Sequence, residues 1–142
     1  MAVSPATWLI DKSVLARLSK PEVRQIMLPR LRAGRVAVSI VTELEVGLSA
    51  RSAGDYKAIR QTMLDYLVPV FVTPRAEQRA REVQVELIRR GQHRAVSIPD
   101  LLVAAVAEIE RLSVLHYDAD FDLVASITGQ PVEWLLPRGT LD

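Results

Sequence analysis

Short apolar runs alternate with amphipathic stretches along the whole chain. The apolar runs have the length of buried strands and lie at residues 8–10, 36–38, 68–72, 113–116 and 131–134. The stretches between them repeat apolar residues at helical spacing and predict helices from about 13, at 21–32, from 39 to about 54, and at 55–66, 74–90, 99–110 and 120–127. Strands that alternate with helices imply right-handed crossovers and a mostly parallel sheet.

This order of elements predicts an α/β fold. We expect one domain, residues 1–142, with a mostly parallel central sheet of four to five strands and helices on both faces. In the helix that Ser39 can cap, the apolar positions suggest an inner face made of Ile40, Val41, Leu44 and Leu48.

The composition excludes several classes of protein. No apolar run reaches the roughly 18 residues that a membrane helix needs, and the first residues show no basic segment followed by an apolar stretch, as a secretion signal would. Cysteine is absent, which excludes disulfides, thiolate metal sites and a cysteine nucleophile. We therefore expect a soluble protein of the cytoplasm.

The net charge is only +1, but the charges are unevenly spread. The local balance is +5 over residues 17–35, +3 over 72–94 and −6 over 95–142. An acidic end beside two basic segments would suit a metal site with a phosphate-binding surface around it. Solvated helix faces explain the same charges, so charge alone does not decide between them.

Acids follow two of the predicted strands. Asp11 comes directly after the first strand, and Asp118, Asp120 and Asp122 come directly after the fourth. Functional groups of parallel sheets collect beyond the carboxyl ends of the strands. Asp11 and Asp118 could equally cap the helices that follow them, but three acids in five residues repel one another unless a cation is present. Asp122 is interpreted as a surface charge.

Asp100 lies at a helix start, where Ser97 and the intervening proline form a typical capping pattern. Asp100 also shares a helix face with the small apolar residues Val103, Ala104 and Ala107, and a carboxylate is costly to bury there unless something neutralises it. Capping and a functional role both remain open for Asp100.

Two glutamates of the helix after Ser39 are further candidates. Gly47 lies one turn after Glu43 and leaves room beside that carboxylate. Helical geometry alone does not separate Glu43 from Glu45. Ser13, two residues after Asp11, is either a cap or a hydroxyl that orients Asp11 or a metal-bound water. His93 and His116 lack the spacing of a zinc site, and His116 is interpreted as structural.

Four segments together resemble a known family. Residues 9–13 (LIDKS), 42–47 (TELEVG), 98–105 (IPDLLVAA) and 115–122 (LHYDADFD) are similar to the motifs of PIN-domain nucleases, and within them of the VapC toxins of bacterial toxin–antitoxin pairs. The resemblance covers essentially the full length, with a family-like interval of 18 between Asp100 and Asp118. Each motif is weak alone, but the four in this order are specific.

The resemblance implies a single PIN-like domain and an endoribonuclease that cuts structured RNA of the tRNA or rRNA class and inhibits translation in the bacterial cytoplasm. It makes Asp11, Glu43, Asp100 and Asp118 catalytic and selects Glu43 over Glu45, because glycine follows Glu43 by four positions. Asp11, Asp100 and Asp118 would hold Mg²⁺ or Mn²⁺, the hard cations that carboxylates prefer, with Glu43 and Asp120 as further ligand candidates and one or two metal ions both possible.

The resemblance also implies partners. They are a cognate VapB-type antitoxin, the RNA substrate and a second copy of the chain in a homodimer or a higher toxin–antitoxin assembly, with no membrane. The basic segments offer RNA-binding candidates: Arg17, Arg24, Arg32, Arg75 and Arg79.

Two other functions are weighed against this one. A catalytically silent PIN-fold module that binds RNA or a partner is the alternative from another class. Residues 115–120 also look like the opening motif of a haloacid-dehalogenase-type phosphatase, but no lysine follows them, as that chemistry requires.

Overall fold

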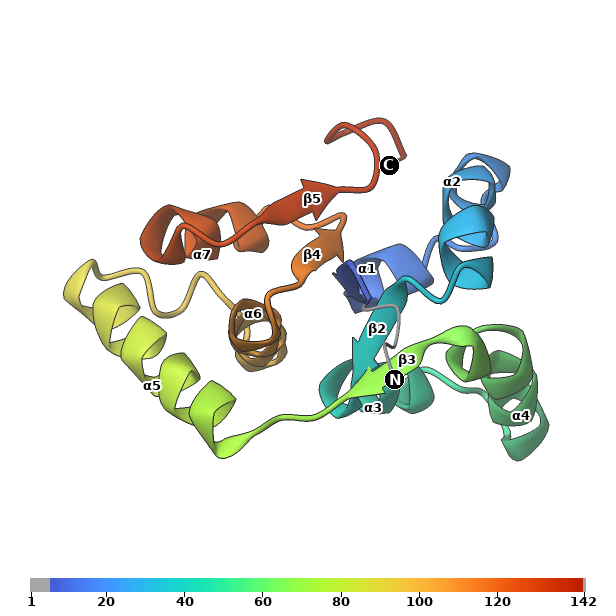
Figure 1. Ribbon diagram of the computed structural model, residues 1–142, viewed down its shortest axis with the longest axis horizontal. Helices are drawn as coiled ribbons and strands as arrows, with labels where there is room; N and C mark the ends of the chain where they lie inside the picture. Colours follow the sequence, from blue (N-terminus) through green and yellow to red (C-terminus); the bar gives the residue numbers. More distant parts are fainter. Residues whose placement is uncertain (1–5, 142) are drawn as a thin grey trace, which may run out of the picture.

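A computed structural model describes residues 6–141. One sheet of parallel strands forms the centre, in the order β3-β2-β1-β4-β5 (Figure 1). The strands are β1 (Trp8–Ile10), β2 (Val36–Ser39), β3 (Val68–Val70), β4 (Ser113–His116) and β5 (Val132–Trp134). The helices are α1 (Lys12–Leu15), α2 (Pro21–Arg32), α3 (Ile40–Leu48), α4 (Ala53–Thr62), α5 (Pro74–Arg89), α6 (Ile98–Glu110) and α7 (Asp120–Thr128), with a 3₁₀ turn η1 (Leu64–Tyr66).

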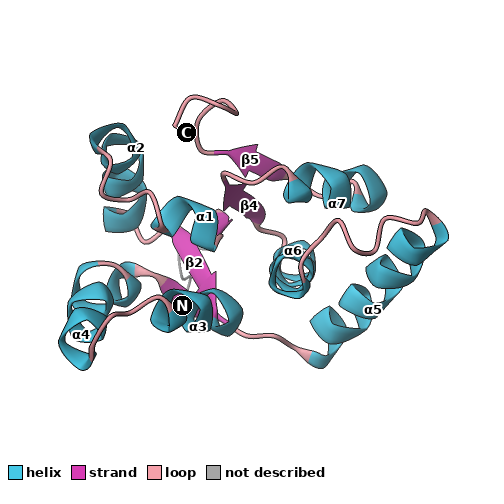
Figure 2. Cartoon of the chain, turned by 180° about the vertical axis from the view of Figure 1, so that it is seen from behind, coloured by secondary structure: helices cyan, strands magenta, loops and turns pink. Residues whose placement is uncertain are grey.

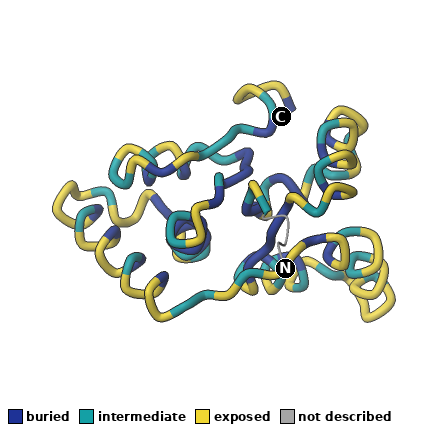
Figure 3. The backbone as a smooth tube through the Cα atoms, viewed as in Figure 1, coloured by how far each residue is buried: buried dark blue, intermediate teal, exposed yellow. Residues whose placement is uncertain are grey.

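The two faces of the sheet each bury their own core. Side chains alternate along a strand, so Leu9 faces one side and Ile10 the other. Leu9 and Val114 belong to a core with α5, α6 and α7, whereas Ile10 and Leu115 belong to a core with α1 and α2. Helices lie on both sides of the strands in Figure 2, and the inner strands β1, β2 and β4 are mostly buried, as Figure 3 shows, whereas the outer strands β3 and β5 are not. The expected α/β fold with helices on both faces is confirmed.

Local signals set most helix boundaries. Pro21 and Pro74 occupy the first turns of α2 and α5, where the missing N–H of proline costs nothing. The side chains of Thr73 and Ser97 accept hydrogen bonds from backbone N–H groups at the starts of α5 and α6. These boundaries agree closely with the expected ones. The expected helix at 55–66 is instead α4 followed by η1, and the expected strand at 68–72 is the shorter β3.

The orientation of α3 differs from the expectation. Thr42 and Val46 face the interior, while Ile40, Leu44 and Leu48 are 49%, 66% and 89% exposed. The expectation that these three residues form the inner face is therefore wrong, although Val41 does pack against the core. Periodicity identifies an apolar stripe on a helix but does not say whether the stripe faces the sheet. Here the stripe lies on the outer surface.

The chain after β5 folds back onto the domain. Leu135 and Leu141 are buried in the core that contains α1 and α2. The backbone N–H of Leu141 donates to the Tyr117 hydroxyl at 2.9 Å, and Lys20 Nζ donates to the Leu141 carbonyl at 2.9 Å. The C-terminal segment is thus fixed beside the end of β4. Among the described residues, no helix combines the length and the apolar character that crossing a membrane requires.

Candidate active site

The aspartates predicted from the sequence meet at one edge of the sheet. β1 and β4 are neighbouring parallel strands, so Asp11 and Asp118, which follow them, lie at the same carboxyl edge. The backbone N–H of Asp11 donates to the Leu115 carbonyl at 2.9 Å, which extends the pairing up to the site. Asp100 reaches this edge from the first turn of α6.

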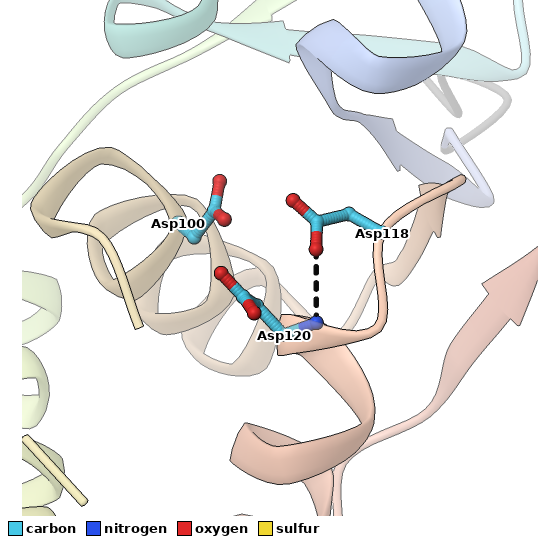
Figure 4. A group of neighbouring side chains, drawn as sticks. All are labelled: Asp100, Asp118 and Asp120. Atoms are coloured by element: carbon cyan, nitrogen blue, oxygen red, sulfur yellow. Dashed lines mark hydrogen bonds between the residues drawn. The ribbon is translucent and has the colours of Figure 1, made fainter. Parts of the chain in front are cut away.

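Three aspartates form a tight group. Asp100, Asp118 and Asp120 each offer a carboxylate oxygen, and these oxygens all lie within 4.8 Å of one another. Figure 4 shows the three side chains converging from α6, from the end of β4 and from the start of α7. One oxygen of Asp118 accepts a hydrogen bond from the Asp120 backbone N–H at 2.9 Å, which fixes the orientation of that carboxylate.

Asp11 combines a structural role with an unused oxygen. Its Oδ2 caps α1 by accepting from the Ser13 N–H at 2.9 Å. Its Oδ1 is buried and has no hydrogen-bond partner among the described residues, although the residue is only 2% exposed. A buried carboxylate oxygen without a partner is costly unless a cation or water binds it. Capping therefore leaves one oxygen of Asp11 free to bind a metal.

Burial and mutual repulsion raise the pKa values of two aspartates in this cluster. Burial, together with the charges of Asp11, Asp118 and Asp120, raises the pKa of Asp100 to about 8. Burial and the Asp118 charge also raise the pKa of Asp120. Acids that raise one another's pKa in a partly buried group are typical of sites that bind a cation or a proton.

Glu43 lies in a surface network between α3 and α4. Arg60 Nη2 donates to Glu43 Oε1 at 2.9 Å, and Arg60 also binds Tyr56 and Asp65. A Cβ added to Gly47 would lie 3.4 Å from the Tyr56 ring, so α4 fills the room that this glycine leaves. The Glu43 carboxylate and the space beside Gly47 therefore both serve the contact between α3 and α4.

Glu45 is the glutamate whose charge interacts with the aspartates. It lies three positions after the inward-facing Thr42, and its Oε1 is buried with no hydrogen-bond partner among the described residues. Burial raises the pKa of Glu45; Lys12, whose Nζ is 3.5 Å from Oε2, opposes this rise, and the Asp11 charge adds to it. The structure thus favours Glu45 over the expected Glu43, because the choice depends on the rotation of α3.

Two neighbours hold the end of β4 in position. Ser13 Oγ accepts from the Tyr117 N–H at 2.8 Å and ties α1 to this strand end. His116 is fully buried between the rings of Phe121 and Trp134, and its Nδ1 accepts from the Asp118 N–H at 3.1 Å. Burial lowers the pKa of His116. Its interpretation as structural agrees with these contacts, but only the fold reveals that it orients Asp118.

The five candidate arginines do not gather at the site. Arg17 lies over the Tyr117 ring, with 4.7 Å from its guanidinium carbon to the ring centroid, beside Asp118. Arg24 and Arg32 are exposed on α2. Arg75 and Arg79 line a separate hollow of about 440 Å³ between α5 and the end of α6. The structure brings only Arg17 next to the acids.

The donor set fits a hard divalent cation. The candidate ligands are all carboxylate oxygens, with no cysteine in the chain and with His116 engaged with the backbone. Oxygen-only sites suit Mg²⁺ and Mn²⁺ and disfavour zinc. The unpaired Oδ1 of Asp11 is the independent observation that agrees with a cation at this place.

A parallel sheet with aspartates converging at its carboxyl edge defines a class of protein. The sequence profile of the PIN domain matches residues 8–127. Ribonuclease VapC51 of Mycobacterium tuberculosis is 44% identical over 135 residues, which are 95% of this chain and 97% of the relative. Ribonuclease VapC2 of the same species is 47% identical over 133 residues, 92% of this chain and 94% of the relative. The chain therefore belongs to the PIN-domain family and, within it, to the VapC group.

Solved structures agree in fold. The DNA-bound VapBC complex from Salmonella typhimurium contains a chain with a TM-score of 0.77 at 17% identity, which covers 92% of this chain and 99% of that one. VapBC-5 from Mycobacterium tuberculosis contains one with a TM-score of 0.61 at 28% identity, covering 91% and 97%. The agreement extends over nearly the whole domain.

Proposed function

We propose that this protein is a metal-dependent endoribonuclease and the toxin of a VapBC-type toxin–antitoxin pair. The observation that carries the proposal is the convergence of Asp100, Asp118 and Asp120 within 4.8 Å, beside the unpaired buried oxygen of Asp11. Relatives with 42–47% identity that are named ribonucleases support the activity. The alternative, a silent RNA-binding module, does not account for four acids kept together at an energetic cost.

The acids would hold Mg²⁺ or Mn²⁺. Asp11, Asp100 and Asp118 are the proposed ligands, and Asp120 is a further candidate. When bound, such a cation lowers the pKa of a water molecule and neutralises charge on the phosphate. The hydrogen bonds from Ser13 to Asp11 and from Asp120 to Asp118 orient the two carboxylates before any ligand binds.

Glu45 completes this arrangement in place of Glu43. Its raised pKa and its unpaired Oε1 suit a group that takes up a proton from an attacking water or orients it. Lys12 pairs with Glu45 at 3.5 Å and partly offsets the acid charge when no cation is present. Glu43 remains the helix-pairing residue of α3 and α4.

Purified protein, free of antitoxin, should cleave structured RNA of the tRNA or rRNA class when Mg²⁺ or Mn²⁺ is present. EDTA should stop the reaction, and excess Mn²⁺ should restore it. The carboxylates are themselves negative, so they need a bound cation to neutralise charge on the phosphate. Gel analysis of the RNA with and without metal measures this. If the protein binds RNA but never cuts it in either metal, the silent module is the correct function.

The partner proposal rests on relatives. Solved structures with this fold are described as VapBC complexes, so we propose a VapB-type antitoxin that restrains this chain in the bacterial cytoplasm, and a homodimeric toxin. Expression alone should arrest growth, and co-expression of the small open reading frame beside the gene should relieve the arrest. Growth curves measure this, with Asp118→Asn as the harmless control. Growth that continues normally while active protein accumulates would contradict the toxin proposal.

A further inference from the structure

A basic groove adjoins Asp118 on the side of β5. The hollow has a volume of about 560 Å³, and Asp118 forms part of its wall. The other side chains that give it its character are Lys12, Arg17, Tyr117, Trp134 and Arg138. We call these residues the basic groove. Three cationic side chains and two aromatic rings thus lie next to the acid cluster.

The cation of Arg17 is held in a defined position. Its guanidinium lies 4.7 Å above the Tyr117 ring centroid, and its Nη1 donates to the Ser13 carbonyl at 2.8 Å. The Tyr117 ring in turn meets Trp134 edge-on, at a centroid distance of 5.4 Å. Arg17 and Trp134 thus flank one tyrosine, which itself directly precedes Asp118. Preorganised groups of this kind bind a ligand at a lower entropic cost.

The C-terminal segment supplies the opposite wall. Arg138 is exposed and lies three residues before Leu141, whose backbone is fixed by Tyr117 and by Lys20 at 2.9 Å each. The family profile matches residues 8–127 only, so Trp134 and Arg138 lie beyond the part of the chain that defines the family. The groove therefore combines Lys12, Arg17 and Tyr117, from the part that the profile matches, with two residues that lie beyond it.

The charges of the basic groove suit a polyanion. Among the described residues that line it, three are cationic, Lys12, Arg17 and Arg138, and one is acidic, Asp118. Lys12 also contacts Glu45, and Asp122 accepts from the indole N–H of Trp134 at 3.1 Å, which orients that ring. Single-stranded nucleic acids bind where cations follow the backbone and aromatic rings stack with bases. The groove offers both.

We propose that the basic groove holds the RNA segment that adjoins the scissile phosphate, with backbone phosphates at Arg17 and Arg138 and a base against Trp134. This inference rests on the proposed ribonuclease function. It places the RNA strand along a path that leads from the acids into the basic groove. The hollow on α5 is a poorer candidate, because none of the described residues that line it belongs to the acid cluster.

Binding of a fluorescently labelled single-stranded oligoribonucleotide tests the proposal. The measurement is anisotropy in EDTA, so that no cleavage takes place, at several salt concentrations. Arg138→Ala should weaken binding roughly fourfold at physiological salt and lower the slope of log K against log salt by about 0.7, the value for one lost phosphate contact. Arg138→Lys should keep the slope. Arg51→Ala, at an exposed arginine before α4 and outside the basic groove, is the matched control and should leave both quantities unchanged.

Tryptophan fluorescence tests the base contact. The chain has two tryptophans, and Trp8 lies under Arg30, 4.1 Å from the guanidinium carbon to the ring centroid. In a Trp8→Phe background the emission reports Trp134 alone, and RNA should quench it. Binding that is unaffected by Arg138→Ala, or emission that RNA leaves unchanged, would overturn the proposal. RNA that binds in the groove but is never cut with Mn²⁺ would instead contradict the ribonuclease function and leave the groove assignment standing.

Discussion

Replacing Asp100 with asparagine is expected to abolish RNA cleavage while the metal-free protein becomes more stable. Asparagine keeps the shape of the side chain but removes the negative charge from the centre of the acid cluster, so we expect cleavage to fall by roughly a hundredfold or more. Initial cleavage rates in Mn²⁺ measure this. Asp65→Asn, at an exposed carboxylate of η1, is the control and should cut like the parent.

The stability gain has a defined pH dependence. The pKa of Asp100 rises from 3.8 to about 8 on folding, so its protonated form is favoured in the folded state. The contribution of Asp100 to the free energy of unfolding of the metal-free parent is fully present below about pH 4. This contribution is lost as the pH rises towards 8. Thermal unfolding in EDTA should therefore show Asp100→Asn gaining over the parent as the pH rises. A difference in melting temperature that stays constant across this range would contradict the repulsion described for the cluster.

Glu45→Gln and Glu43→Gln form the second decisive pair. Glu45 interacts with Asp11 and has an unpaired buried oxygen, so its replacement should lower cleavage by roughly tenfold or more. Glu43→Gln should cut within about twofold of the parent and lose at most about 1 kcal/mol of stability, as the ion pair with Arg60 is partly exposed. Cleavage rates and thermal unfolding of both variants measure this.

If Glu43→Gln lowers cleavage and Glu45→Gln does not, Glu43 has the role in cleavage that we propose for Glu45. That outcome would mean that α3 turns when metal and RNA bind, because Arg60 would have to release the Glu43 carboxylate. Arg60→Ala provides the check. If Glu43 has only the helix-pairing role, this variant should unfold at a lower temperature and cut RNA at an unchanged rate.

Local signals explain why most of the fold could be predicted. Pro21 and Gly34 bracket α2, and the apolar run from Ser113 to His116 is β4. Asp11 and Asp118 could be placed together because the carboxyl ends of neighbouring parallel strands meet at one edge of the sheet, and the family resemblance added Asp100. The cap that Asp11 forms does not compete with the proposed function, since it uses only one oxygen of that carboxylate.

The parts that could not be predicted depend on packing between distant segments. The rotation of α3 decides between Glu43 and Glu45, and it follows from Thr42 packing under β1 rather than from the pattern of the helix itself. The contact of Ser13 with Tyr117 spans 104 residues, and that of Leu141 with Tyr117 spans 24. No local pattern signals such pairs, so the basic groove became visible only in three dimensions.

The strand order has a consequence for the synthesis of this protein. β4 inserts beside β1, which is translated well before it, and Asp118 follows two residues after the end of β4. A growing chain that carries Asp11 and Asp100 still lacks the third acid until residue 118 has been translated. The ribosome that makes this chain therefore has to pass the codon for Asp118 before the acid cluster can assemble. A message broken upstream of the codon for Asp118 encodes a fragment that lacks the complete acid cluster.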